Sequence, residues 1–185
     1  MKKYLSDYKP FLLFLAKFFA VYLVLTFAYQ SYLFEFDTNK NEVDGFTKTV
    51  ASQTEIVLSI FDNHSFIMKN LKEPCVNLFF HNQWVARIIE GCNALSVIIL
   101  FISFVFAFTG KFGKTIVFIL FGSLIIHFFN IVRIALLAMS VYYHPKSQEF
   151  LHNIVFPLFI YGVVFLLWII WVNKFSFYAS KPYKK

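Results

Sequence analysis

The chain has 185 residues, of which 59% are hydrophobic, and it includes 27 phenylalanines and 10 tyrosines. A soluble domain of this length lacks the interior volume to bury so many large apolar side chains, which excludes an ordinary soluble protein and favours one exposed to lipid. The net charge of +7 would suit nucleic-acid binding, but the lysines flank apolar segments, where they indicate membrane topology instead. We therefore expect a lipid bilayer as a partner and no nucleic acid.

Four apolar segments are candidates for membrane-spanning helices, because a hydrocarbon core of ~30 Å requires ~20 residues at 1.5 Å each. They run from about residue 11 to 34, 94 to 109, 115 to 142 and 154 to 172. The first is expected to be a retained helix, since it is long, contains Lys17 and is followed by no small-residue cleavage pattern. The predicted fold class is an all-α integral membrane protein with about four transmembrane helices.

The charged residues predict the orientation of these helices. Lysines lie before the first segment, between the second and third, and after the last. They are Lys2, Lys3, Lys9, Lys111, Lys114, Lys174, Lys181, Lys184 and Lys185. Eight of the ten acidic residues lie between Glu35 and Glu90. By the positive-inside rule, both termini are cytoplasmic, and residues 35–90 and 143–152 face outward.

The long outer segment is expected to carry secondary structure of its own. In "DGFTKTVASQTEIVLSIFD" (44–62), apolar residues recur at roughly helical spacing, which predicts an amphipathic helix against the outer leaflet. They are Phe46, Val50, Ile56, Val57, Ile60 and Phe61. Beyond Pro74, "VNLFF" and "WVARII" flank the polar turn "HNQ", which predicts a short β-hairpin leading into Glu90-Gly91-Cys92.

Three chemically capable side chains are predicted at the same depth, near the outer face of the membrane. Cys92 begins the second span, and His152 lies at the start of the fourth. Arg133 follows Lys114 by 19 residues, or ~28 Å along a helix. A thiolate can attack a carbonyl, an imidazole can transfer protons, and a guanidinium can stabilise an oxyanion. Together they could perform acyl transfer through a thioester, with water, an amine or a hydroxyl as acceptor.

Other polar residues have supporting or purely structural interpretations. Glu90 could tune the site, or could simply form an ion pair with Arg133. Asn130, one turn below Arg133, is a candidate for orienting it, and His127 lies deeper on the same polar stripe. Cys92 alone could be a small apolar residue of a helix. The sequence shows no metal-ligand spacing and no phosphate-binding glycine loop, so we expect neither a metal nor a cofactor.

The stretches "EGCNALSVIILF" and "NIVRIALLA", 41 residues apart from cysteine to arginine, followed by a histidine at the start of the next span, resemble the exosortase/archaeosortase family, in particular its compact XrtF-like subgroup. The resemblance covers about residues 75–172. It implies a polytopic cysteine protease and transpeptidase of the bacterial cytoplasmic (inner) membrane, with an extracytoplasmic active site.

The same resemblance implies membrane-anchored protein substrates with C-terminal sorting signals, and Cys92, Arg133 and His152 as the catalytic residues. The family usually has Ser-Gly after the cysteine, where this chain has Asn93-Ala94; Asn93 is counted as a supporting residue. We divide the chain into an N-terminal cytoplasmic segment with the first transmembrane helix (1–34), an extracytoplasmic loop (35–90), a three-helix catalytic membrane core (91–173) and a basic cytoplasmic tail (174–185).

Two other classes of protein compete with this interpretation. A membrane thiol-disulfide oxidoreductase would use Cys75 and Cys92, the only cysteines, but such enzymes usually contain a closely spaced pair such as C-x-x-C, which is absent here. A transporter or channel subunit would place intramembrane charges near the midplane. In this chain, the charged residues are instead predicted near one face of the membrane.

Overall fold

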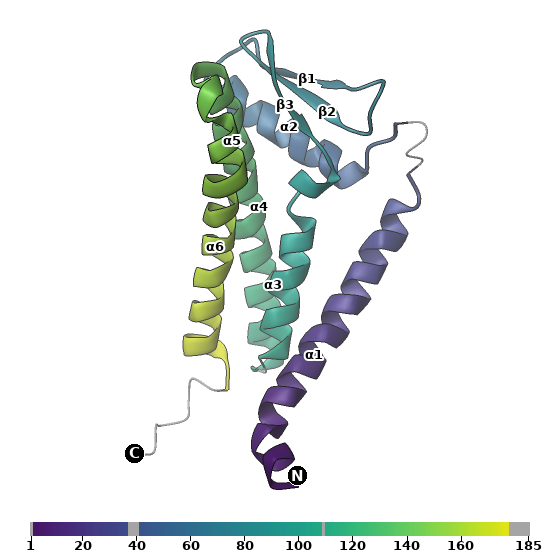
Figure 1. The fold of residues 1–185 in the computed structure, drawn as a ribbon, viewed down its shortest axis with the longest axis vertical. Helices are drawn as coiled ribbons and strands as arrows, with labels where there is room; N and C mark the ends of the chain where they lie inside the picture. Colours follow the sequence, from purple (N-terminus) through teal and green to yellow (C-terminus); the bar gives the residue numbers. More distant parts are fainter. Residues whose placement is uncertain (1, 37–40, 109, 178–185) are drawn as a thin grey trace.

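A computed structural model of the chain describes residues 2–36, 41–108 and 110–177, with side chains from residue 8 onward. Its body consists of the long helices α1 (Lys2–Leu33), α3 (Leu95–Ala107), α4 (Phe112–Tyr143) and α6 (Phe156–Ile170). Figure 1 shows them side by side, and α3 contacts α1, α4 and α6. Most of the predicted basic tail, from residue 178 on, lies outside the described residues.

Three stretches of helix within the described ranges are long and apolar enough to cross a membrane: Tyr8–Leu33, Phe112–Tyr143 and Pro145–Phe175. The last of these joins α5 (Gln148–Phe150), a π-helical segment (Leu151–Val155) and α6. The second predicted span is the shorter helix α3, whose 13 residues cover ~20 Å at 1.5 Å each. The predicted class, a helical membrane protein with a short hairpin, is confirmed.

The helices pack closely where Gly122 of α4 faces α3. A Cβ atom at Gly122 would lie 2.3 Å from the ring atom Cζ of Phe101, and the Phe101 side chain is fully buried. Apolar side chains of α3, α4 and α6 continue this contact along the bundle; they are Ala94, Ile98, Phe101, Val105, Ile126, Ile160, Val164, Leu167 and, just after α6, Trp171. The helices that carry the candidate site are therefore held in fixed register.

A second layer covers one end of the bundle (Figure 1). It contains α2 (Gly45–Ser59) and a three-stranded antiparallel sheet in the order β1–β2–β3: β1 (Phe66–Lys69), β2 (Val76–Phe80) and β3 (Gln83–Ile88). The predicted hairpin is β2–β3. His81 and Asn82 between these strands both have positive φ angles, 50° and 59°, as a tight two-residue hairpin turn requires. Strand β1 was not predicted.

The predicted amphipathic helix is α2, and Phe46, Val50 and Val57 of the predicted apolar set pack in or against the core. The buried residues are Thr47, Val50, Ala51, Thr54 and Leu58, which follow helical spacing. Ile56, Ile60 and Phe61 are exposed. Contact of this exposed face with the outer leaflet remains a prediction.

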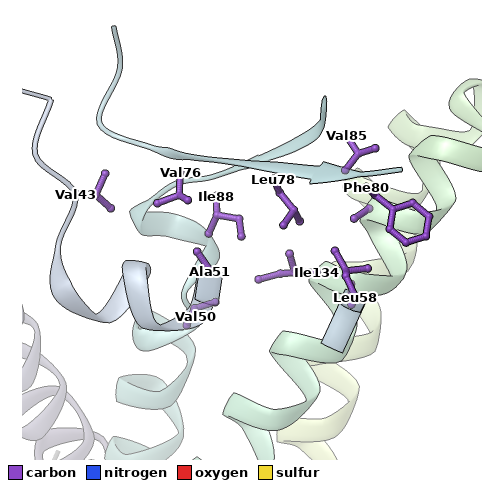
Figure 2. Close-up of a cluster of buried hydrophobic side chains, with 12 residues drawn as sticks. Val43, Val50, Ala51, Leu58, Val76, Leu78, Phe80, Val85, Ile88 and Ile134 are labelled. Atoms are coloured by element: carbon purple, nitrogen blue, oxygen red, sulfur yellow. The ribbon is translucent and has the colours of Figure 1, made fainter. Parts of the chain in front are cut away.

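The outer layer and the bundle share one apolar core, shown in Figure 2. Side chains of α2, the sheet and the adjoining part of α4 point toward one another there. The fully or nearly buried members are Val43, Val50, Ala51, Leu58, Val76, Leu78, Phe80, Val85, Ile88, Ile134, Ala135 and Ala138. Cys92 packs against this cluster, so the candidate nucleophile lies where the sheet, α2 and α4 meet.

Candidate active site

Cys92 lies in a sharp turn between the sheet and the bundle. Residues Glu90–Cys92 form a single 3₁₀ turn that connects β3 to α3. The backbone N–H of Cys92 donates to the carbonyl of Ile89 at 2.9 Å. Two residues later, Ala94 adopts a left-handed conformation with φ 63° as the N-cap residue of α3. The thiol is partly buried, and its backbone is fixed on both sides.

Asn130 of α4 connects this turn to Arg133. The Asn130 side chain is completely buried. Its Nδ2 donates to the backbone carbonyl of Cys92 at 2.8 Å, and its Oδ1 accepts from Nη1 of Arg133 at 3.3 Å. One buried amide is therefore hydrogen-bonded to both the backbone of the candidate nucleophile and the candidate cation.

Arg133 is half-buried in α4 and has an unused hydrogen-bond donor. Its Nε is buried and has no partner among the residues that the structure describes. The guanidinium interacts electrostatically with Cys92 and with Tyr161 of α6. The sequence left open an ion pair between Glu90 and Arg133. No such pair is present in the described part of the chain.

Glu90 and Asn93, which flank Cys92 in the sequence, bind Tyr29 of α1. The Tyr29 hydroxyl donates to Oε1 of Glu90 at 2.5 Å and accepts from Nδ2 of Asn93 at 3.1 Å. Nδ2 of Asn93 also donates to the Thr47 hydroxyl of α2 at 3.0 Å. Tyr29 was not singled out in the sequence; the available signal was a tyrosine near the outer end of an otherwise apolar span.

His152 is not brought to this group. It is exposed in the π-helical segment that precedes α6, and its side chain makes no hydrogen bond or ion pair with any described residue. It lines a shallow pocket of about 370 Å³ with residues of its own turn. Tyr161, which does interact with Arg133, lies nine residues further along the chain, or ~13 Å by helical rise.

His127 is engaged in a different contact. Its Nε2 lies 2.7 Å from Oε1 of Gln53 on α2, and its ring lies 5.5 Å from that of Phe46. These contacts fasten α2 to α4 one turn below Asn130. The structure thus favours the interpretation of His127 as a structural residue.

A cavity of about 470 Å³ opens beside the Cys92 turn. Its walls come from the C-terminal end of α1, from residues 42–44, from residues 73–75 before β2, from Arg87 of β3, and from residues 89–91. The apolar side chains are Leu33, Phe36, Val43, Pro74 and Ile89, and the charged ones are Glu42, Asp44, Glu73, Arg87 and Glu90. Arg87 and Glu73 form an exposed ion pair at 2.6 Å. Glu90 and Gly91 of the Cys92 turn line this cavity, whereas Cys92 and Arg133 do not.

The two cysteines have different surroundings and do not form a disulfide. Cys75 is completely buried just before β2, and burial raises the pKa of its thiol. A buried thiol of this kind is a poor source of the thiolate that disulfide exchange needs. Within the described ranges, no three His, Cys, Asp or Glu side chains are grouped so that they could hold a metal ion.

A model of a known protein family matches most of this chain. The family model described as transmembrane exosortase (Exosortase_EpsH) matches residues 13–172. The matched range includes Cys92, Arg133 and His152, and it begins within α1. Searches of curated proteins and of solved structures found no match.

Proposed function

Because the chain belongs to the transmembrane exosortase family, we propose that it is a membrane-embedded cysteine protease and transpeptidase that cleaves C-terminal protein-sorting signals. The observation that carries this proposal is the link from the Cys92 backbone through buried Asn130 to Arg133. Such a link has a clear use in acyl transfer, since it fixes a nucleophile relative to a cation that can stabilise developing negative charge.

The proposed reaction has two steps. The Cys92 thiolate attacks the carbonyl carbon of the scissile peptide bond, and the resulting oxyanion is stabilised by the Arg133 guanidinium. Collapse of this intermediate breaks the C–N bond, leaves the upstream segment as a thioester on Cys92, and releases the amine, which takes up a proton. An acceptor amine, hydroxyl or water then attacks the thioester and regenerates the thiol.

His152 is proposed as the group that transfers these protons. A general base must come within about 3 Å of the proton that it removes, and catalytic contacts are often formed only with substrate bound. The π-helical segment at His152 supports this assignment, because such irregular turns are frequent at functional sites. The assignment requires the outer end of the last helix to approach Cys92 in the substrate complex.

The proposed substrate is a membrane-anchored protein whose own helix lies beside the bundle. Its sorting motif would enter the cavity of about 470 Å³ next to Glu90 and Gly91. We further propose that the protein resides in the bacterial cytoplasmic membrane with both termini inside and the site outside, as the lysine distribution predicts.

Substrate processing in cells that carry Cys92→Ala or Cys75→Ser tests the proposal. A tagged membrane protein with a C-terminal helix and basic tail is followed by immunoblot for loss of that tail. We expect Cys92→Ala to accumulate the full-length precursor and Cys75→Ser to process normally. Equal failure of both variants would point to a cysteine pair and to the oxidoreductase interpretation. Normal processing by Cys92→Ala would overturn the proposal.

A further inference from the structure

We propose that Tyr29 of α1 is a positioning residue for the Cys92 nucleophile. This inference rests on the proposed function, in which Cys92 is the attacking group. It assigns a role in the reaction to the first membrane helix. This helix has few buried side chains, and no residue of its most apolar 18-residue stretch is buried. Tyr29 is the exception near its outer end, with only 9% of its surface exposed.

The hydrogen bonds of Tyr29 hold the Cys92 turn at both ends. Its hydroxyl donates to the Glu90 carboxylate at 2.5 Å and accepts from the Asn93 amide at 3.1 Å. Glu90 and Asn93 are the first residue of the 3₁₀ turn and the residue that follows it. A single hydroxyl therefore fixes the two positions between which the thiol is placed.

Asn93 makes this attachment rigid because its side chain is fully used. It is 1% exposed, and its Nδ2 donates to both Tyr29 and Thr47. Its Oδ1 accepts from the backbone N–H of Leu95 at 2.9 Å, at the start of α3. An amide whose donors and acceptor are satisfied in a buried setting has one favourable orientation. With Asn130, the turn is thus held from α1, α2 and α4.

The bond between Tyr29 and Glu90 also has an electrostatic consequence. Glu90 is two residues from Cys92, and a carboxylate near a thiol disfavours the thiolate. Donation of the Tyr29 proton fixes the Glu90 carboxylate against α1 and partly neutralises it. Without this bond, the carboxylate is free to turn toward the thiol and to compete with it for the Arg133 guanidinium.

The test uses full-length protein in the Cys75→Ser background, so that Cys92 is the only thiol. The pH dependence of Cys92 alkylation by iodoacetamide is measured for Tyr29→Phe and for two control variants on the same helix. Tyr22→Phe alters a tyrosine that stacks on Phe18 and makes no hydrogen bond to a described residue. Tyr32→Phe removes a bond from the Gly45 N–H at 3.1 Å, which joins α1 to α2 without involving the Cys92 turn.

For Tyr29→Phe we expect alkylation at pH 7 to slow about tenfold, with the profile shifted to higher pH, in keeping with the loss of one charge-assisted hydrogen bond. Both controls should follow the parent protein. Adding Glu90→Gln to Tyr29→Phe should return the profile toward that of the parent, because the charge that opposes the thiolate is then absent. If Tyr29 and Glu90 had only a structural role, the slowing of alkylation caused by Glu90→Gln would instead add to that caused by Tyr29→Phe.

Processing kinetics separate this inference from the proposed function. If the enzyme cleaves sorting signals, Tyr29→Phe should lower kcat about tenfold with little change in KM. Parent-like alkylation by Tyr29→Phe, or a slowing equal to that of Tyr32→Phe, overturns the inference. If the parent protein processes no substrate while Tyr29→Phe still shifts the alkylation profile, the proposed function fails and the role of Tyr29 stands.

Discussion

Replacement of Asn130 by leucine tests the link between the nucleophile and the cation most directly. Leucine matches asparagine in shape but leaves the Cys92 carbonyl and one Arg133 N–H without their partner. Because Asn130 is completely buried, each lost bond leaves a desolvated group, at about 1–3 kcal/mol apiece. The contact with Arg133 is the longer of the two, 3.3 Å against 2.8 Å, and should contribute less. We therefore expect Asn130→Leu to lower the free energy of unfolding by roughly 2–4 kcal/mol.

The effect on the reaction should exceed the effect on stability. A displacement of about 1 Å in a reacting group can lower the rate about 100-fold, and Asn130 is the α4 residue that holds the Cys92 backbone. We therefore expect Asn130→Leu to lower the rate of sorting-signal cleavage by about two orders of magnitude. Cleavage is followed by immunoblot of the tagged substrate, and folding by thermal melting in detergent.

Asn130→Asp separates the two hydrogen bonds. Aspartate keeps an acceptor for Arg133 but cannot donate to the Cys92 carbonyl, whose oxygen it would instead repel. If the backbone bond positions the thiol, Asn130→Asp should be as slow as Asn130→Leu despite a retained Arg133 contact. Wild-type cleavage by Asn130→Leu, in protein that melts normally, would refute the reasoning.

Three further predictions concern stability and are checked by thermal melting. Burial favours a higher pKa for Asp62, but hydrogen bonds from His81 and His64 outweigh it and lower the pKa below 3.8. The Asp62 carboxylate should therefore contribute fully to stability above about pH 5. This contribution should be lost as the pH falls through the lowered pKa, so wild type and Asp62→Asn should converge in acid. Gly122→Ala should destabilise by about 1–3 kcal/mol through overlap with the Phe101 ring, whereas Gly162→Ala, which meets open space, should not. Ala94→Gly should stabilise by up to about 1 kcal/mol, since it relieves a left-handed alanine at φ 63°.

The outer layer shows what a sequence pattern can and cannot predict. The β2–β3 hairpin was predictable because alternating side chains surround a polar turn, and burial alternates along β2 as expected. Strand β1 has a mostly exposed edge pattern without alternation, so it carries no period-two signal. In α2, the polar residue Thr54 can be buried because its hydroxyl donates to the Val50 carbonyl of the same helix, 2.8 Å away. Thr47 can be buried because its hydroxyl accepts a hydrogen bond from the Asn93 amide.

From the sequence alone, the candidate site residues could be grouped only by their depth along the predicted helices. Counting residues from Lys114 predicts Arg133 at the level of Cys92, and Asn130 follows from helical spacing. Tyr29 could not be assigned in this way, because its partners lie more than 60 residues away in the sequence. Depth alone also grouped His152 with these residues, but the structure leaves it exposed in the π-helical segment before α6.

The hydrogen bonding of Arg133 suits the role of electrostatic stabiliser proposed for it. Buried polar groups are nearly always paired, so an unpaired donor needs a reason. Nη1 of Arg133 is anchored by Asn130, whereas its buried Nε has no partner in the described part of the chain. A donor that bound a protein acceptor would have to break that bond before it could stabilise an oxyanion. A free donor on an anchored guanidinium avoids this cost and is already oriented when negative charge develops, and it lies within electrostatic reach of the thiol that would create that charge.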